Sequence, residues 1–299
     1  MAQRRVGAGT SRVLAGSPSL DAALSGLRES FYAQQLHGVV GLAAAERAVR
    51  ETVLWQLRVV AGWLPATGTG MARAVAGTFE IENIVALAHQ FDGGPRAPEP
   101  FQMGALGTAW HRLESTTSAG DLAAALHTTS WGDGSGGTPA ALGPGMLGTV
   151  LRVVWARRLA AMAPPARPWC GALCVLTAAR CVGDGGVTAP PQLLHLLRPV
   201  LGRSWESAGS LGDFRAALSP SLHMVLRDLA SPRELWRAEA RIHFDVEKDA
   251  FGLLRHSMPG PDVVLGAMMV LSMDAWRVRA ALAAAAAGAG ASEVLDEAA

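Results

Sequence analysis

The sequence predicts an all-α protein assembled from repeated helix pairs. Apolar residues recur every three or four positions through most of the 299-residue chain, which is the spacing of one helix face. Hydrophobic residues make up 50% of the chain and aromatic residues only 6%, so burial has to come from many small contacts between side chains such as Ala, Leu and Val. Strand-forming residues are few, and this composition favours close-packed helices.

The helices can be placed in order along the chain. Residues 1–18 are rich in Gly, Ser and Arg, show no sustained period and are expected to form a flexible leader. A first helix is expected at residues 19–36, and a second at residues 41–64, which Pro65 ends. The Gly- and Pro-rich breaks between periodic segments predict further helices at residues 70–89, 106–115, 121–128, 146–162, 169–181, 191–201, 211–218, 222–229, 232–254 and 261–286.

The chain also resembles itself. Residues 106–126 and 201–218 both begin with Leu-Gly and carry Trp, Ser and Asp in the same order. Trp110 and Trp205 lie 95 positions apart (205 minus 110), whereas Asp121 and Asp213 lie 92 apart (213 minus 121), so the second segment is three residues shorter. The Asp-Gly-Gly sequence at position 92 recurs 92 positions later, at 184. Abundant Ala and Leu cannot explain matched Trp and Asp-Gly-Gly, so we interpret the similarity as a duplication.

A third copy is expected near the C-terminal end of the sequence. The predicted helix pair at residues 232–254 and 261–286 mirrors the pairs at residues 41–89 and 146–181. The sequence therefore predicts a leader at residues 1–18 and three helical repeats at residues 19–133, 134–220 and 221–299. An amphipathic helix pair cannot bury its apolar stripe alone, so the copies are expected to pack against one another.

Charge and hydropathy exclude several classes of protein. The chain has 26 Lys and Arg against 25 Asp and Glu, and a formal charge of +1 is too small for sequence-independent attraction to phosphates, so nucleic acid is not an expected partner. The uncharged apolar runs near residues 169–179 and 263–273 are shorter than the 18 residues that suggest a membrane span. The first residues lack the apolar core of a secretory signal, so we expect a cytoplasmic protein.

No catalytic motif stands out in the sequence. It contains no His-Glu-x-x-His, no phosphate-binding Gly-x-x-x-x-Gly-Lys-Ser/Thr and no Gly-x-Ser-x-Gly. We therefore expect a protein that is not an enzyme and that needs no cofactor.

Three cysteines leave one metal-binding alternative open. Cys170, Cys174 and Cys181 are separated by four and seven positions, which places them on one face of a helix. They could form a thiolate metal site, with a histidine as a further ligand. The absence of a second Cys or His cluster at zinc-finger spacing favours the other interpretation, in which the three thiols are small apolar core residues.

A family resemblance rests on three stretches. Residues 78–84 contain an acid-x-x-Asn-aliphatic sequence, Glu80 to Ile84, late in a predicted helix. This stretch resembles the signature Asp-x-x-Asn-Leu that the C (or d) subunit family of V-type and archaeal A-type ATPases carries once in each of three pseudo-repeats. Residues 22–36 are similar to the first helix of that family, and residues 261–282 to its last long helix.

The match extends over roughly residues 20–285 and has two departures. In the last helix Asp274 takes the acidic position, Val278 the aliphatic one and Arg279 the basic one, but Arg277 replaces the expected Asn. The second copy reads Ala-Leu-Cys-Val at residues 172–175 and has lost both polar positions. The order, number and spacing of the repeats carry the resemblance, because each motif is short.

The resemblance implies a funnel of three similar helical domains about a pseudo-threefold axis. Such a non-catalytic subunit is a socket on the cytoplasmic face of the proteolipid rotor ring. It holds the central stalk and thereby couples ATP hydrolysis or synthesis to proton or sodium transport. The residues expected to contact partners are Glu80, Glu82, Asn83, Asp274, Arg277 and Arg279. The alternative is a helical-repeat adaptor or scaffold unrelated to rotary ATPases, in which these side chains belong to an ordinary solvated face.

Overall fold

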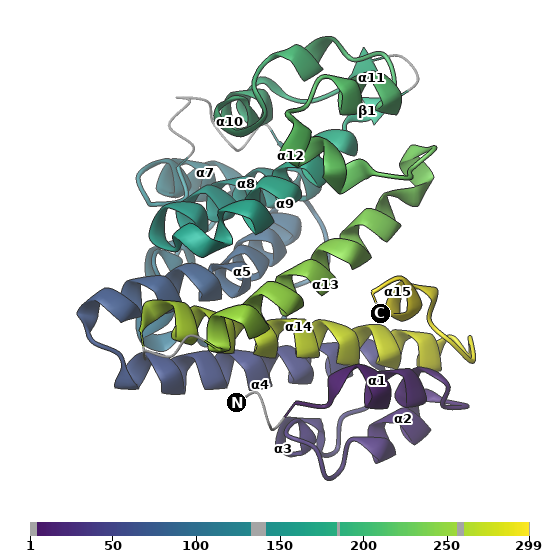
Figure 1. Cartoon of the computed structure of the whole chain (residues 1–299). Helices are drawn as coiled ribbons and strands as arrows, with labels where there is room; N and C mark the ends of the chain where they lie inside the picture. The colour runs from purple at the N-terminus through teal and green to yellow at the C-terminus, as the bar shows by residue number, and fades with distance from the viewer. Residues whose placement is uncertain (1–4, 133–141, 184–185, 256–259, 299) are drawn as a thin grey trace. The chain divides into compact units, whose positions relative to one another are not determined.

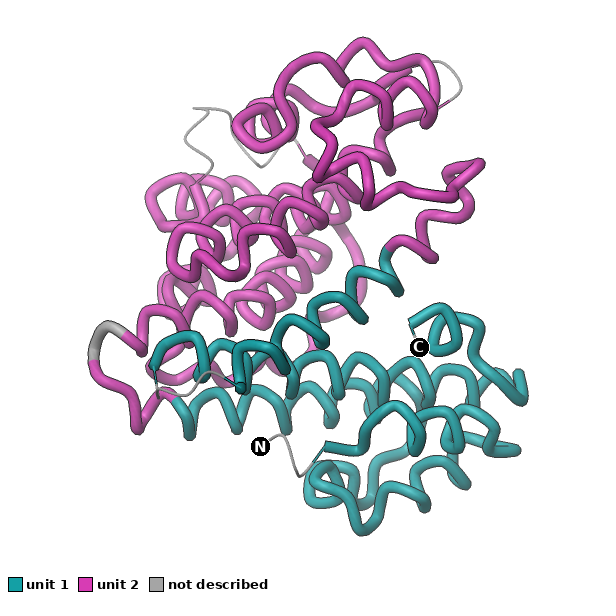
Figure 2. Tube along the Cα trace, in the orientation of Figure 1, with its two compact units in different colours: residues 1–60, 239–299 teal, residues 61–238 magenta. Residues whose placement is uncertain are grey.

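The prediction of an all-α fold is confirmed by a computed structural model, which describes residues 5–132, 142–183, 186–255 and 260–298 (Figure 1). The described chain divides into two compact units. Unit 1 comprises residues 1–60 and 239–299, and unit 2 comprises residues 61–238 (Figure 2). The predicted repeat boundaries follow sequence similarity and do not coincide with these two units, so the division into three repeats stays a prediction.

Unit 1 joins the two ends of the chain around one long helix. Its helices are α1 (Gly7–Ala15), α2 (Leu20–Gly26), α3 (Ala33–Leu36), most of α4 (Leu42–Trp63), most of α13 (Leu235–Leu254), α14 (Pro261–Ala286) and α15 (Glu293–Glu297). Helices α1, α2 and α15 all pack against α14. Pro261 occupies the first turn of α14, where its missing N–H removes no helical hydrogen bond.

Unit 2 is built around three long helices that pack in sequence, α5 on α8 and α8 on α9 (Figure 1). These are α5 (Ala66–Phe91), α8 (Pro144–Met162) and α9 (Arg167–Ala179). The α5–α8 packing depends on Gly77, since a Cβ there would lie 2.9 Å from the Trp155 ring. Because the two helices approach closely, Trp155 Nε1 on α8 donates a hydrogen bond of 2.7 Å to the backbone carbonyl of Ala74 on α5.

Shorter elements complete unit 2. They are 3-10 turns η2 (Gly104–Leu106), η4 (Pro164–Ala166), η5 (Ser204–Ser207), η6 (Met224–Leu226) and η7 (Pro232–Glu234), helices α6 (Trp110–Leu113), α7 (Ala119–His127), α10 (Pro191–Leu201), α11 (Leu211–Ala216) and α12 (Pro220–His223), and the two-residue strands β1 (Val182–Gly183) and β2 (Gly186–Val187). The strands pair antiparallel, with Val182 opposite Val187, and were not predicted from the sequence.

The expected flexible leader is corrected by the structure. Residues 7–15 of that segment form helix α1, in which Ser11, Leu14 and Ala15 are buried. No periodic signal marks this helix in the sequence, because α1 is held by tertiary contacts with α14.

The single helix expected at residues 19–36 is also corrected, because it divides into α2 and α3. The Ser30 hydroxyl donates a 2.7 Å hydrogen bond to the carbonyl of Leu27 and accepts one of 3.2 Å from the N–H of Tyr32. Such local bonds between side chain and backbone compete with the helical pattern.

The two segments that resemble each other in sequence share local geometry. Ser118 precedes α7 and accepts a 3.1 Å hydrogen bond from the N–H of Asp121, and Ser210 precedes α11 and accepts one of 3.1 Å from the N–H of Asp213. Both serines satisfy a helix N-terminus in the same way. The two matched tryptophans differ in burial, because Trp205 is fully buried and Trp110 is only half-buried.

The matched Asp-Gly-Gly sequences cannot be compared in the same way. The first follows α5 directly, whereas the second begins at residues 184–185, which lie outside the described residues.

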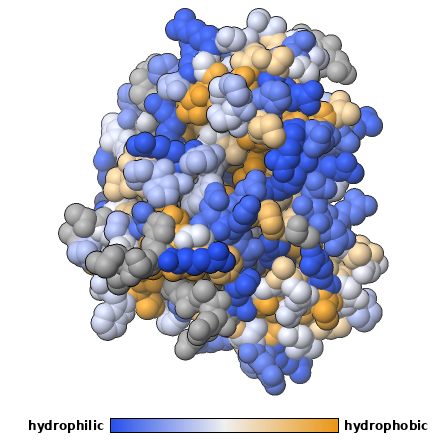
Figure 3. All heavy atoms as spheres, in the orientation of Figure 1, coloured by the Kyte–Doolittle hydropathy of each residue, from blue (hydrophilic) through white to orange (hydrophobic). Residues whose placement is uncertain are grey.

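Within the described residues, no helix combines the length and the hydropathy needed to cross a bilayer. On the face shown in Figure 3, hydrophilic residues cover most of the surface and hydrophobic residues lie between them in small groups.

Candidate functional site

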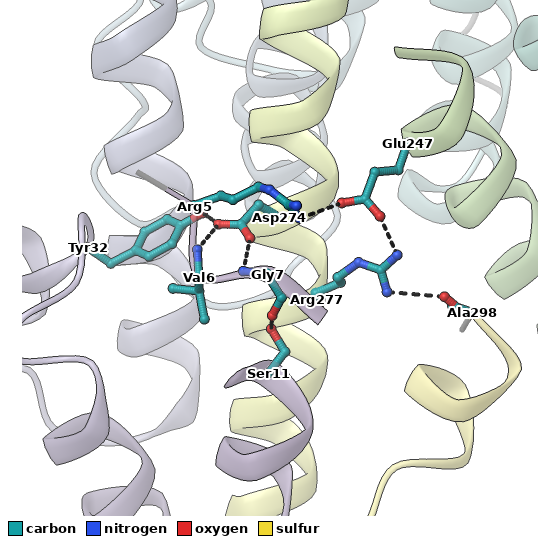
Figure 4. A network of polar contacts seen from close by, with 9 residues as sticks. All are labelled: Arg5, Val6, Gly7, Ser11, Tyr32, Glu247, Asp274, Arg277 and Ala298. Carbon is teal, nitrogen blue, oxygen red and sulfur yellow. Dashed lines mark hydrogen bonds and ion pairs between the residues drawn. The ribbon is translucent and has the colours of Figure 1, made fainter. Parts of the chain in front are cut away.

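Asp274, one of the six residues expected to contact a partner, lies inside unit 1 (Figure 4). Its carboxylate on α14 accepts hydrogen bonds from the N–H groups of Val6 at 3.1 Å and Gly7 at 2.7 Å, and from the Tyr32 hydroxyl at 2.9 Å. The two N–H groups belong to the first turn of α1, which has no acidic residue of its own there. A carboxylate at a helix N-terminus satisfies unpaired N–H groups and interacts favourably with the helix dipole. Asp274 therefore anchors α1.

Tyr32 completes this anchor as a neutral donor. Burial raises the pKa of Tyr32 well above its usual value, and the charge of Asp274 and the hydrogen bond to it raise the pKa further. The phenol stays protonated, so its O–H remains available to the carboxylate.

Arg277, three residues after Asp274, holds the C-terminal segment of unit 1. Its Nη1 donates a 3.2 Å hydrogen bond to the carbonyl of Ala298, and its Nη2 donates to Glu247 on α13. Glu247 also lies 3.6 Å from Arg5 Nη1, so one buried carboxylate is shared by two guanidinium groups (Figure 4). Breaking such a buried pair on one side leaves an uncompensated charge, which is strongly destabilising.

Glu80 makes the corresponding arrangement in unit 2. The side chain, on α5, is fully buried and accepts hydrogen bonds from the N–H groups of Thr108 at 3.0 Å, Ala109 at 2.6 Å and Trp110 at 2.7 Å. The Thr108 hydroxyl and, at 3.0 Å, the Trp131 indole N–H also donate to it. Glu80 therefore caps the start of α6, as Asp274 caps the start of α1.

Asn83, three residues after Glu80, fixes the segment that follows α5. Its amide donates a 3.0 Å hydrogen bond to the carbonyl of Phe101, and its oxygen accepts one of 2.8 Å from the N–H of the same residue. The Phe101 ring then packs edge-on against Phe79, with ring centroids 5.3 Å apart.

In both long helices, an acidic residue and the residue three positions after it make the same two kinds of contact. In α5 and in α14, each 26 residues long, a buried acid caps the first turn of another helix and also accepts a hydrogen bond from a buried aromatic donor. The residue three positions later binds a backbone carbonyl in the segment that follows the helix. At the corresponding positions of α9, residues 172 and 175 are a buried Ala and a buried Val, which can form neither anchor.

Four of the six predicted contact residues are therefore buried and make side-chain hydrogen bonds inside the chain: Glu80, Asn83, Asp274 and Arg277. Glu82 and Arg279 are half-buried, and Arg279 lies 4.0 Å from Glu46. The structure brings Glu80, Glu82 and Asn83 together in unit 2, and Asp274, Arg277 and Arg279 together in unit 1. Contact with a partner stays a prediction for all six residues, and Glu82 and Arg279 are the two with partly accessible side chains.

Sequence reasoning missed the groups that complete the anchors. Tyr32, Trp131 and Glu247 were not selected because each lies far along the chain from its partner, up to 242 residues for Tyr32 and Asp274. A buried carboxylate requires hydrogen-bond donors. The single Tyr of the chain, Tyr32, was the one sequence feature that could have suggested a donor for Asp274.

The three cysteines lie in an apolar interior, on α9 and just after it. Cys170, Cys174 and Cys181 are all buried, and burial raises the pKa of Cys170 and of Cys174 to about 12. Among the described residues no three His, Cys, Asp or Glu side chains are grouped as metal ligands. Because metals bind thiolates, this environment favours the interpretation of the cysteines as packing residues.

We expect none of the three thiols to react with 5,5′-dithiobis(2-nitrobenzoic acid) at pH 8 in the native protein, because protonated and buried thiols are poor nucleophiles. Absorbance at 412 nm should report close to zero thiols before unfolding and all three in guanidinium chloride. Rapid reaction of Cys170 or Cys174 in the native state would contradict this assignment.

A comparison with protein-family models finds no match, and a search of curated proteins finds none either.

Proposed function

We propose that the protein is a non-catalytic socket subunit of a rotary V/A-type ATPase, linking the proteolipid rotor ring to the central stalk. In this role its three helical repeats form a funnel about a pseudo-threefold axis, peripheral to the cytoplasmic face of the membrane. The single observation that carries the proposal is the paired anchor at Glu80 and Asn83 and at Asp274 and Arg277. The anchors coincide with the acid-x-x-polar positions by which the sequence resembles the C (or d) family of V/A-type ATPase subunits.

The physical argument concerns stiffness. A socket that transmits torque must not yield when its partner turns, and each buried acid ties a long helix to the start of another helix through charge-assisted hydrogen bonds. Asn83 and Arg277 tie the next chain segment to the same helix. Helices held in this way form a rigid wall, and the coupling of the motor requires that property and no catalytic group.

Affinity purification from detergent-extracted membranes of the native host tests the proposal. Tagged protein should recover the proteolipid subunit and central-stalk subunits, identified by mass spectrometry. Glu82→Ala and Arg279→Ala should reduce this recovery while leaving the circular dichroism spectrum unchanged, because both side chains are partly accessible. Recovery of unrelated proteins only, by a folded bait, would contradict the proposal and favour a helical adaptor.

A further inference from the structure

Unit 1 contains an open hollow that the anchors do not use. Its volume is about 700 Å³, within the range of small-ligand sites of roughly 300–1,000 Å³. The residues that line it include Leu27, Phe31 and Trp55 as apolar groups and Gln34 and Gln56 as amides. Trp55 is 52% exposed, so an aromatic surface is available at the hollow in the free protein.

Gln56 is the unusual group in this hollow. The residue is only 8% exposed, and its side chain makes no hydrogen bond or ion pair with any part of the chain that the structure describes. A side-chain amide carries two N–H donors and an oxygen with two lone pairs, and the described chain offers the Gln56 amide no partner for any of them. Val53, Leu54 and Leu57 nearby on α4 are buried apolar residues, so the amide is not required by the pattern of the helix. The amide therefore presents free donors and a free acceptor to a group that enters the hollow.

The same protein shows what such an amide binds. Asn83 forms two hydrogen bonds with one residue's backbone, that of Phe101, while the Phe101 side chain packs against an aromatic ring on α5. In the hollow of unit 1, Gln56 has the same amide chemistry, and Trp55 and Phe31 are its aromatic neighbours along the lining. A backbone peptide group with an apolar side chain matches both features.

We propose that this hollow binds an extended polypeptide segment of a partner protein, with a peptide group on Gln56 and an apolar or aromatic side chain against Trp55 and Phe31. Main-chain hydrogen bonds give such a site affinity for extended backbone, and the aromatic surface selects the side chain. The site consists of unit 1 residues alone, so it does not depend on the partner being part of a rotary ATPase.

The test uses N-acetyl-L-phenylalanine N-methylamide, which carries the required peptide groups and one aromatic side chain. Titrated into ¹⁵N-labelled full-length protein, it should shift the side-chain amide signals of Gln56 saturably in the millimolar range. Gln56→Leu should weaken binding about tenfold, because two hydrogen bonds are lost. Trp55→Ala should also weaken binding. Trp63→Ala should not, because Trp63 is exposed on the same helix and does not line the hollow.

Thermal unfolding separates binding from folding. Gln56→Leu removes no hydrogen bond within the described chain and keeps a side chain of similar size, so its Tm should be close to that of the wild type. Loss of binding with an undiminished Tm supports the site. No saturable shift in the wild type, or equal binding by Gln56→Leu, overturns it. If Gln56→Leu does not fold, Trp55→Ala decides alone, and binding equal to that of Trp63→Ala overturns the proposal.

Discussion

Replacing Glu80 with Ala should lower the free energy of unfolding by about 3–5 kcal/mol, the largest effect we expect from any single polar substitution in unit 2. The substitution leaves the N–H groups of Thr108, Ala109 and Trp110 and the indole N–H of Trp131 without their acceptor. Buried donors without acceptors are costly. Urea unfolding followed by far-UV circular dichroism measures the change.

Two further variants make this experiment specific. Glu80→Gln keeps the shape of the side chain but turns an NH₂ group toward donors. Its free energy of unfolding should therefore lie between that of the wild type and that of Glu80→Ala. Glu114→Ala removes an exposed acid in the same unit and should change the free energy of unfolding by less than about 0.5 kcal/mol. Equal effects of Glu80→Ala and Glu114→Ala would show that Glu80 is no anchor.

Replacing Arg277 with Met should have an effect of similar size in unit 1, a loss of about 3–5 kcal/mol. Among the described residues, Glu247 is then left buried with Arg5, 3.6 Å away, as its remaining counter-charge, and the carbonyl of Ala298 loses its donor. Glu247→Leu should also be destabilising, because it leaves the guanidinium of Arg277 buried and without its acid partner. The double variant should be clearly less destabilised than the sum of the two single variants, since it removes both buried charges.

The partly exposed pair of Arg198 and Glu206, 2.7 Å apart in unit 2, is the control. Solvent screens this pair, so its double-mutant cycle should give a much smaller coupling than the cycle of Arg277 and Glu247. A coupling of equal size in the two cycles would contradict the role assigned to the buried pair.

The sequence predicted the long helices well and the short ones poorly. The expected helix at residues 261–286 agrees with α14, and the expected helix at residues 41–64 differs from α4 by one residue at each end. Both have long apolar stripes and clear Gly or Pro boundaries, so local information fixes them. Helices α1 and α15 were missed, because α1 begins on a carboxylate 267 residues away and α15 packs on α14. Long-range contacts of this kind leave no periodic signal.

The residues selected from the sequence as partner contacts include four internal anchors, and their environment was not predicted. The acid-x-x-polar pattern selected Glu80, Asn83, Asp274 and Arg277, and the structure shows that each holds a distant part of the same chain. A polar residue on a predicted helix is assigned to the surface by default, because charged residues are seldom buried without partners. The partners here are backbone groups far along the chain, and no spacing rule identifies those. The matched positions in α5 and α14 are the feature that sequence and structure share.

Hydrogen–deuterium exchange of Glu80→Gln and Asp274→Asn measures most directly whether α5 and α14 carry equivalent anchors. Each variant should lose protection locally, at residues 108–113 for Glu80→Gln and at residues 6–11 for Asp274→Asn, while the long helix that carries the substitution stays protected. Unchanged protection at both helix starts, or loss spread evenly over the whole chain in both variants, would contradict the account.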